Sequence, residues 1–561
     1  PLQKKMGAPG TPGDRSADFV ELVSSAPQDA GAAAGPSPDT KSARPTTDIT
    51  EDIATAASSK TNGENEIHYE QSFPSKIGTL PLSVMVFYSV SGGPIGIEPA
   101  VRAGGFLFSL LGFALAPLAW SVPEALVTAE LGSAFPEASG GVAWVEEAFG
   151  SRAGFVSGFF TWMSGATDNA IYPVLFLDYL FQVVAKSEQD GERDGIFSDM
   201  EEPLMRFIVL SSMSVVLAAI NYTGLEIVGN MSMVICLISL SPFLILSLVG
   251  IPKVDPQRWF QTIGAEEIAM DGDGLSSEGW LSLANLGGVL WRPFLNNLFW
   301  NLNSFDSAAN FAGEVENPGT VFPRAMFLSL PLVVVSYFVP LLIAIGASNS
   351  SRADWSDGYL AKVCTDVVGP WLGNWTVFAA AISNIALFLS EMSSDAFQIY
   401  GMAERGLVPK VFAAKSRFGT PTYGIILGTM VIIAMSAADF STLVEMLNFN
   451  YSVALLMEYA AFIKLRISRS EVPRPYRIPL NTAGCICFVA PPVLMTLLIM
   501  ALASYMTYVY FAAALAFGLL IYKLQACRER SCCQYSQITN LTAEVSEEEF
   551  FLAQELTTSS T

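Results

Sequence analysis

Histidine is almost missing from this chain of 561 residues, and the single one, His68, lies in a polar stretch near the N-terminus. Its scarcity excludes histidine proton relays, histidine metal sites and catalytic triads from the rest of the chain. The seven cysteines show no metal-ligand spacing, and the sequence has no phosphate-binding loop. We therefore predict a protein that is not an enzyme and that holds no metal and no cofactor.

Charge is scarce as well, because Asp, Glu, Lys and Arg together make up only 15% of the residues. The net charge of −22 excludes nucleic-acid binding, which needs a basic face. Hydrophobic residues make up 51%, and apolar runs of about 20 residues recur, each long enough to cross a bilayer. These features predict an all-α polytopic membrane protein that has the lipid bilayer as a partner.

The composition divides the chain into three parts. Residues 1–75 are rich in Ala, Gly, Pro, Ser and Thr, and residues 526–561 are acidic, so we expect two disordered tails. Residues 76–525 form the predicted membrane domain of twelve helices. Its twelve predicted spans are 77–103, 106–134, 152–182, 204–221, 225–250, 284–314, 323–347, 368–403, 421–438, 440–464, 484–503 and 505–525.

The distribution of Lys and Arg predicts the orientation of these spans. Basic residues are concentrated in 405–417 and 464–477, whereas the loops 186–202 and 252–279 are acidic. Because basic loops stay on the cytoplasmic side, both termini are expected to be cytoplasmic.

The first predicted span contains SVSGGPIGIE, Ser89 to Glu98, at the depth where a membrane helix should be most regular. Glycine costs about 1 kcal/mol and proline about 3 kcal/mol in a helix interior. Non-helical backbone at membrane depth is tolerated only where it is buried in protein or lines a cavity. We interpret the stretch as a break that forms part of a site, rather than as a kink in a packing helix. Glu98 either supplies negative charge to the site or caps the helix that follows.

A second interruption lies in the sixth predicted span, where NLNSFDSAAN is polar and contains Asp306. The first and sixth spans occupy matching positions in two halves of five spans each. Five is odd, so the halves have opposite orientation, and paired interrupted helices at such positions point to a transporter site.

Further acids lie within the predicted spans, namely Glu124, Asp168, Asp178, Glu391 and Asp395. Tyr172 follows Asp168 by four residues and therefore shares its helix face, as Asp395 does with Glu391. Only Arg206 and Arg292 are near enough to neutralise them. A cavity lined by these acids would attract cations and could hold protons.

Several long motifs resemble the amino acid–polyamine–organocation superfamily, and within it the plant-type polyamine:proton symporters, a branch near the L-type amino acid transporters. These motifs include VSGGPIGIEPAVRAGG, SGATDNAIYPVLFLDYL, LFWNLNSFDSAANFAGEVENPGTVFPRA and EMSSDAFQIYGMAERGLVPKVFAAKSRFGTP. The resemblance covers about 78–524. It implies a LeuT-type fold, with ten helices in two inverted repeats of five plus two extra helices. It also implies substrate bound at the two breaks, alternating access, and a short surface helix near 140–150.

Site residues follow from the matched motifs and from the acids above. The expected substrate-binding residues are Gly92, Gly93, Gly96, Glu98, Asp168, Tyr172, Asn303, Phe305 and Asp306. The sixth span carries Ser-Phe-Asp where plant relatives have Tyr-Trp-Asp, which weakens cation–π contact with an amine. The fifth span lacks the lysine that some proton-coupled relatives use, so coupling is expected from a carboxylate, with Glu124 and Glu391 as candidates. A sodium position at Ser393 and Ser394 is the alternative.

The predicted function is secondary import of polyamines of the putrescine and spermidine class with protons. Pro94 supports this function because it removes one backbone donor that a substrate carboxylate would need. A carrier of neutral or cationic amino acids on the same fold is the alternative, and a non-transporting nutrient receptor is a third possibility. The resemblance favours the plasma membrane, and the sequence leaves partner subunits open.

Overall fold

The computed structural model describes residues 76–187, 203–263, 288–436 and 440–525. These residues form helices. They also contain two isolated β-bridges, and no strand is present among them. Both predicted tails, 1–75 and 526–561, lie outside the described residues. The main helices are α1 (Thr79–Val90), α2 (Glu98–Ala116), α3 (Val122–Ala134), α4 (Gly141–Phe149), α5 (Ser151–Ser187), α7 (Pro203–Tyr222), α8 (Leu225–Gly250), α10 (Trp291–Leu302), η6 (Phe305–Glu314), α11 (Pro318–Ala347), α12 (Tyr359–Val367), α13 (Pro370–Glu404), α14 (Thr422–Met435), α15 (Phe440–Ser468), α16 (Thr482–Leu502) and a final helix, Tyr505–Gln525.

The described helices confirm the prediction of an all-α polytopic membrane protein. Seven of them are long and apolar enough to cross a membrane by length and composition. The other predicted spans coincide with helices that are interrupted, short or rich in polar residues: α1, α5, α10 with η6, α14 and α15. A short helix does lie near 140–150: it is α4, which Gly140 and Gly150 bound with positive φ angles of 46° and 87°. Its position on the membrane surface stays a prediction.

The boundary between the first two predicted spans falls inside α2. Gly105 has a φ of 69° there, a conformation open to glycine but strained for other residues. The helix therefore changes direction at Gly105, and residues 98–104 belong to the first interrupted span.

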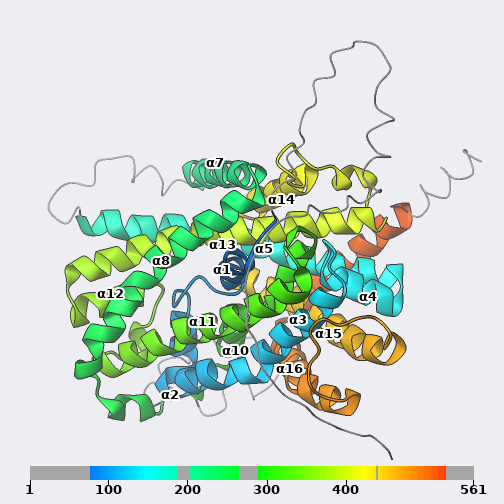
Figure 1. Cartoon of the computed structure of the whole chain (residues 1–561). Coiled ribbons are helices and arrows are strands. Elements are labelled where there is room, and N and C mark those ends of the chain that lie inside the picture. The colour runs from blue at the N-terminus through cyan, green and yellow to red at the C-terminus, as the bar shows by residue number, and fades with distance from the viewer. Residues whose placement is uncertain (1–75, 188–202, 264–287, 437–439, 526–561) are drawn as a thin grey trace, which may run out of the picture. The chain divides into compact units, whose positions relative to one another are not determined.

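The two interrupted spans contact each other on both sides of their breaks. At the start of α1, the amide of Ile77 donates to the carbonyl of Glu314 at 2.9 Å, and the amide of Glu316 donates to the carbonyl of Ile77 at 3.0 Å. On the other side of the breaks, the amide of Leu290 donates to the carbonyl of Ala103 at 3.0 Å. At the first break, the Asn297 side chain donates to the carbonyl of Gly96 at 2.8 Å. Figure 1 shows α1 near the centre of the helices, and α1 packs against α8, α11, α13 and η6.

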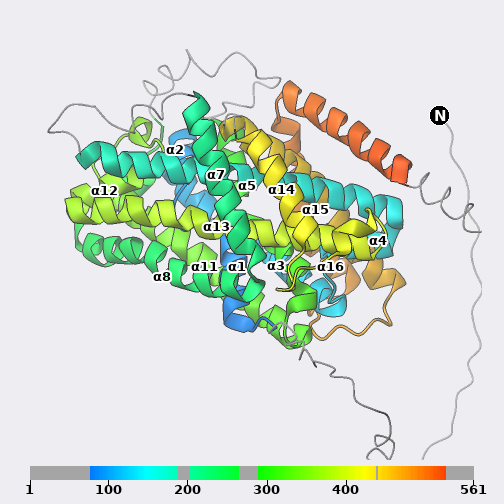
Figure 2. The ribbon, with the colours of Figure 1, turned by 90° about the horizontal axis from the view of Figure 1, so that it is seen from above.

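Two long helices flank the breaks. α5 has 37 residues and α13 has 35, and they pack along one another. At 1.5 Å per residue each exceeds the hydrocarbon thickness of about 30 Å. The final helix, orange-red in Figure 2, packs on α5 through Phe160 and Phe511, whose ring centres are 4.9 Å apart.

A buried ion-pair cluster ties α3 to α15. Glu130 accepts from Arg466 at 2.7 Å and lies 3.2 Å from Arg474, and its side chain is fully buried. The amide of Ile478 also donates to Glu130, at 2.8 Å. This charge is therefore fully paired, unlike the acids near the breaks.

Candidate functional site

Several backbone amides of the first break, residues 91–97, have acceptors within the break or next to it. Gly93 and Gly96 have φ angles of 89° and 82°, which let the chain leave helical geometry. The Gly93 amide donates to the Ser91 hydroxyl at 3.1 Å, and the Ile95 amide donates to the carbonyl of Gly93 at 2.7 Å. The Gly96 amide donates to the carboxylate of Glu98 at 3.0 Å. The Glu98 carboxylate therefore binds the backbone of the break through the Gly96 amide.

At the second break, a carboxylate from another helix accepts from the first amide of η6. Ser304 has a φ of 75°, an uncommon conformation for a residue with a side chain. Its amide donates to the Tyr451 hydroxyl at 3.2 Å, and the Phe305 amide donates to Glu124 at 2.6 Å. The Tyr451 hydroxyl also lies within hydrogen-bond distance of Glu124, at 3.0 Å, and of Asp306, and it can donate its one hydrogen to either carboxylate. The N-terminus of η6, where a substrate anion would bind, therefore already holds a protein carboxylate.

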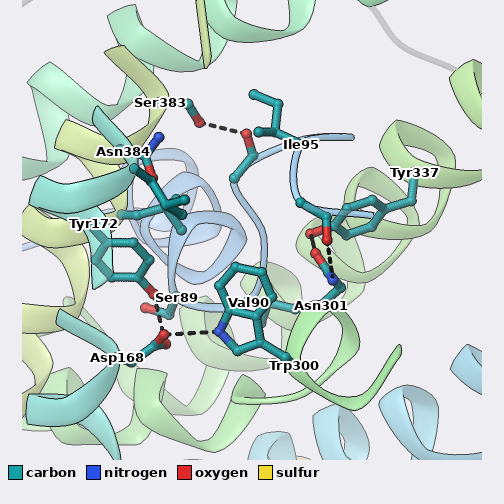
Figure 3. Close-up of a pocket in the computed structure, with 14 residues that line it drawn as sticks. Ser89, Val90, Ile95, Asp168, Tyr172, Trp300, Asn301, Tyr337, Ser383 and Asn384 are labelled. Carbon is teal, nitrogen blue, oxygen red and sulfur yellow. Dashed lines mark hydrogen bonds between the residues drawn. The ribbon is translucent and has the colours of Figure 1, made fainter. Parts of the chain in front are cut away.

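A cavity beside the first break is called here the aromatic pocket. It is lined by Ser89, Val90, Gly92, Ile95, Gly96, Asp168, Tyr172, Leu175, Trp300, Asn301, Tyr337, Ser383, Asn384 and Leu387. Figure 3 shows Asp168 between two aromatic donors, the Trp300 indole at 2.9 Å and the Tyr172 hydroxyl at 2.7 Å. The predicted shared helix face of Asp168 and Tyr172 is thus confirmed. The Ser383 hydroxyl fixes the break by donating to the carbonyl of Gly92 at 2.5 Å.

A second cavity, called here the acidic pocket, lies beside the second break. It is lined by Thr161, Ser164, Gly165, Asp168, Asn303, Ser304, Ser307, Asn310, Glu391, Ser394, Asp395, Gln398, Leu447 and Tyr451. Asp168 lines both pockets, and Glu391 and Asp395 share one face of α13 as predicted. Asp395 accepts from the Asn169 amide at 3.2 Å. Three carboxylates therefore face this one cavity.

Arg206 and Arg292, which were expected to lie near the predicted acids, do not pair with these three carboxylates. Arg206 pairs with Asp178 at 2.8 Å, and Arg292 pairs with Glu445. Among the described residues, no Lys or Arg lies within 4.0 Å of the carboxylates of Asp168, Glu391 or Asp395. The two pockets therefore present uncompensated acceptors.

The predicted site residues separate into two groups. Those that line a pocket are Gly92, Gly96, Asp168, Tyr172, Asn303 and Glu391. Those that line neither pocket are Gly93, Glu98, Glu124, Phe305 and Asp306. The second group shapes the breaks: its members supply backbone turns, or they contact the amides and Tyr451 described above. The described residues contain no group of three His, Cys, Asp or Glu that could hold a metal ion.

Sequence reasoning missed Trp300, Tyr451 and Glu458. Trp300 lies in the apolar half of the sixth span and resembles a core aromatic. Tyr451 stands in LNFNYSVALL, where the two asparagines inside a span are the available signal. Glu458 is 3% exposed and lies against Gly141, where an added Cβ would come within 1.9 Å of its carboxylate.

Two interrupted helices that contact one another and border cation-attracting pockets, within a set of membrane-crossing helices, define a membrane transporter. The sequence model of the amino acid permease family matches residues 77–519, and the chain belongs to this family. The protein is therefore a transporter and not an enzyme, as predicted.

Curated relatives cover most of the same region. A probable polyamine transporter of Arabidopsis thaliana is 42% identical over 449 residues, 80% of this chain and 86% of the relative. The polyamine transporter PUT1 of Oryza sativa subsp. japonica is 41% identical over 445 residues, 79% of this chain and 77% of the relative. The polyamine transporter RMV1 of Arabidopsis thaliana is 40% identical over 446 residues, 80% of this chain and 84% of the relative. The resemblance to plant-type polyamine transporters is thus confirmed.

Proposed function

We propose that this protein imports polyamines of the putrescine and spermidine class with protons, by alternating access between the two sides of the membrane. The names of the relatives support the substrate class. The residues at the two breaks support it independently, because they favour a cation that has no carboxylate.

The observation that carries the proposal is the use of backbone amides at both breaks. An amino acid carrier on this fold needs free amides to hold the substrate carboxylate. Here Pro94 has no amide hydrogen, and the amides of Gly93, Ile95 and Gly96 already have protein acceptors. At the second break, Glu124 places a negative charge where the substrate carboxylate would lie. A polyamine needs none of these donors.

The uncompensated carboxylates supply the attraction. A buried charge is costly unless it is paired, so Asp168 and Glu391 favour the entry of a cation. The Trp300 and Tyr172 rings line the pocket beside Asp168, where they can add cation–π contact with an ammonium group. These two rings can make the cation–π contact that was expected of Phe305. Phe305 cannot make it, because it is fully buried and lines neither pocket.

Proton coupling is assigned to a carboxyl, with Glu124 and Glu391 as candidates. Each has a buried Oε2 atom without a hydrogen-bond partner. A proton on Glu124 would remove its charge from the N-terminus of η6 and give it a donor. Proton binding would then change the hydrogen bond between Glu124 of α3 and the second break. This change would couple the proton to a movement of the helices.

Uptake of labelled spermidine by proteoliposomes tests the proposal directly. We expect accumulation when the outside is made acidic, no dependence on sodium, and little competition by excess leucine. Accumulation that sodium alone drives would overturn the coupling assignment. Leucine uptake without any uptake of putrescine or spermidine would favour the amino acid carrier that the family name suggests.

The protein is proposed to lie in the plasma membrane with both termini cytoplasmic. Basic segments such as 405–417 support this orientation. Epitope tags at the two ends should be reached by antibody only after the cells are permeabilised. Labelling of a tag on intact cells would show that this end is extracellular and would contradict the proposed orientation.

A further inference from the structure

The aromatic and acidic pockets follow one another along the same two long helices. α5 contributes 168–175 to the aromatic pocket and 161–168 to the acidic pocket, a shift of seven positions. α13 contributes 383–387 and then 391–398, a shift of at least eight positions. At 1.5 Å per residue these shifts place the pocket centres about 10 Å or more apart. Asp168 forms the wall that they share.

The acidic pocket contains acceptors that have no donor. Glu391 Oε2 and Gln398 Oε1 are buried without a hydrogen-bond partner, and these side chains are only 7% and 1% exposed. The amide nitrogen of Gln398 is already used, because it donates to the carbonyl of Gly158 at 3.1 Å. Both oxygens lack a hydrogen-bond donor. An ammonium group could supply one, because it offers several N–H donors and no acceptor.

The pocket is shaped to keep a carboxylate in place. An added Cβ at Gly165 would lie 2.1 Å from Asp395 Oδ1, so only glycine leaves room for this carboxylate. Elsewhere in the lining, Asn310 donates to Ser394 at 2.9 Å, and Ser394 donates to the carbonyl of Ser307 at 3.1 Å. The walls are thus fixed by protein bonds, while Glu391 keeps an open acceptor.

We propose that the acidic pocket is a second ammonium subsite, formed by Glu391 and Asp395, for the far end of a linear polyamine whose near end lies against Asp168 in the aromatic pocket. This inference rests on the proposed function and narrows its substrate class. It also assigns Glu391 to the substrate and leaves Glu124 as the coupling carboxyl.

The separation of the pockets selects the length of the substrate. Single bonds of about 1.5 Å that meet at about 111° advance about 1.25 Å each along an extended chain. The terminal nitrogens of putrescine are then about 6 Å apart and those of spermidine about 11 Å apart. The nitrogen separation of spermidine matches the separation of the pocket centres, and that of putrescine is shorter.

The first test uses the unaltered protein. Binding of diamines from 1,4-diaminobutane to 1,10-diaminodecane is measured by competition with labelled spermidine, and monoamines of equal carbon number serve as controls. Affinity for monoamines should rise smoothly with each added methylene. Affinity for diamines should show an additional step of about tenfold where the nitrogens become about 10 Å apart. If the affinities of diamines and monoamines rise in parallel with chain length, without a step for the diamines, the proposal is overturned.

The second test uses Glu391→Gln, with Glu404→Gln as a matched control at the exposed end of the same helix. We expect Glu391→Gln to lower the spermidine-to-putrescine affinity ratio by about tenfold and to retain accumulation driven by a pH gradient. The control should leave the ratio unchanged. Equal losses for both substrates would remove Glu391 from the subsite, and a loss restored by sodium would identify a sodium site instead. Failure of the unaltered protein to transport any polyamine would overturn the proposed function itself.

Discussion

Replacement of Asp168 by asparagine is expected to weaken polycation binding without disturbing the fold. The carboxylate accepts from Trp300 at 2.9 Å and from Tyr172 at 2.7 Å. Asparagine has the same shape, and its oxygen can keep one of these donors. The Tyr172 hydroxyl can turn to accept from the new amide nitrogen. The substitution therefore removes the charge and preserves the local contacts.

The size of the effect follows from the lost charge. A hydrogen bond to a charged group contributes about 1.5–3 kcal/mol, and about 1.4 kcal/mol corresponds to a tenfold change in affinity. The Kd for spermidine should therefore rise by about 10- to 140-fold. Two charges 4 Å apart at an effective dielectric of 20 would interact by about 4 kcal/mol. Water that enters the pocket screens this interaction, so the smaller range is expected.

Equilibrium binding of labelled spermidine to the purified protein measures this change. Asp178→Asn is the matched control, because it makes the same substitution on the same helix. Asp178 pairs with Arg206, its side chain is 44% exposed, and such pairs contribute at most about 1 kcal/mol. A Kd for Asp168→Asn within twofold of the unaltered protein would refute the role of Asp168 as an ammonium ligand.

Three further substitutions address coupling, pocket shape and stability. Glu124→Gln should abolish accumulation driven by a pH gradient while exchange of spermidine across the membrane continues; retained accumulation would remove Glu124 from coupling. Gly165→Ala should displace Asp395, with which an added Cβ would collide at 2.1 Å, and should weaken spermidine binding by about tenfold. Glu130→Gln breaks a buried ion pair with Arg466 and should lower stability by about 3–5 kcal/mol, seen as a lower thermal unfolding temperature.

Matched variants control two of these substitutions. Gly78 has no atom within 4 Å of an added Cβ, so Gly78→Ala should leave spermidine binding unchanged. Arg469 pairs with Glu147 at 3.4 Å and its side chain is 51% exposed, so Arg469→Gln should barely change the unfolding temperature. Comparable effects in a control and its test variant would contradict the reasoning for that pair.

The spans and the two breaks could be predicted because their signals are local. Glycine and proline within an apolar run indicate a break directly, and Gly93 and Gly96 do adopt positive φ angles there. The spans outside the seven long apolar helices include α1, which is apolar but short, and α5, α15 and the α10–η6 pair, and all of them contribute pocket residues. An interrupted or less apolar span was therefore one sign of the site.

The division into two pockets could not be predicted, because it depends on contacts between residues far apart in the chain. Glu124 reaches the amide of Phe305, 181 positions away, and Trp300 reaches Asp168, 132 positions away. Phe305 and Asp306 follow the break directly, yet helix packing turns them away from both cavities. Only the packed helices determine which polar residues face open space.

The shared position of Asp168 has a consequence for transport speed. A chain of ammonium groups that passes from one pocket to the next meets a new counter-charge before it leaves the previous one. The barrier for this passage should then be low, because no ammonium group is stranded without a partner. Turnover should be limited by helix movement, and substrates with different numbers of ammonium groups should share one activation enthalpy.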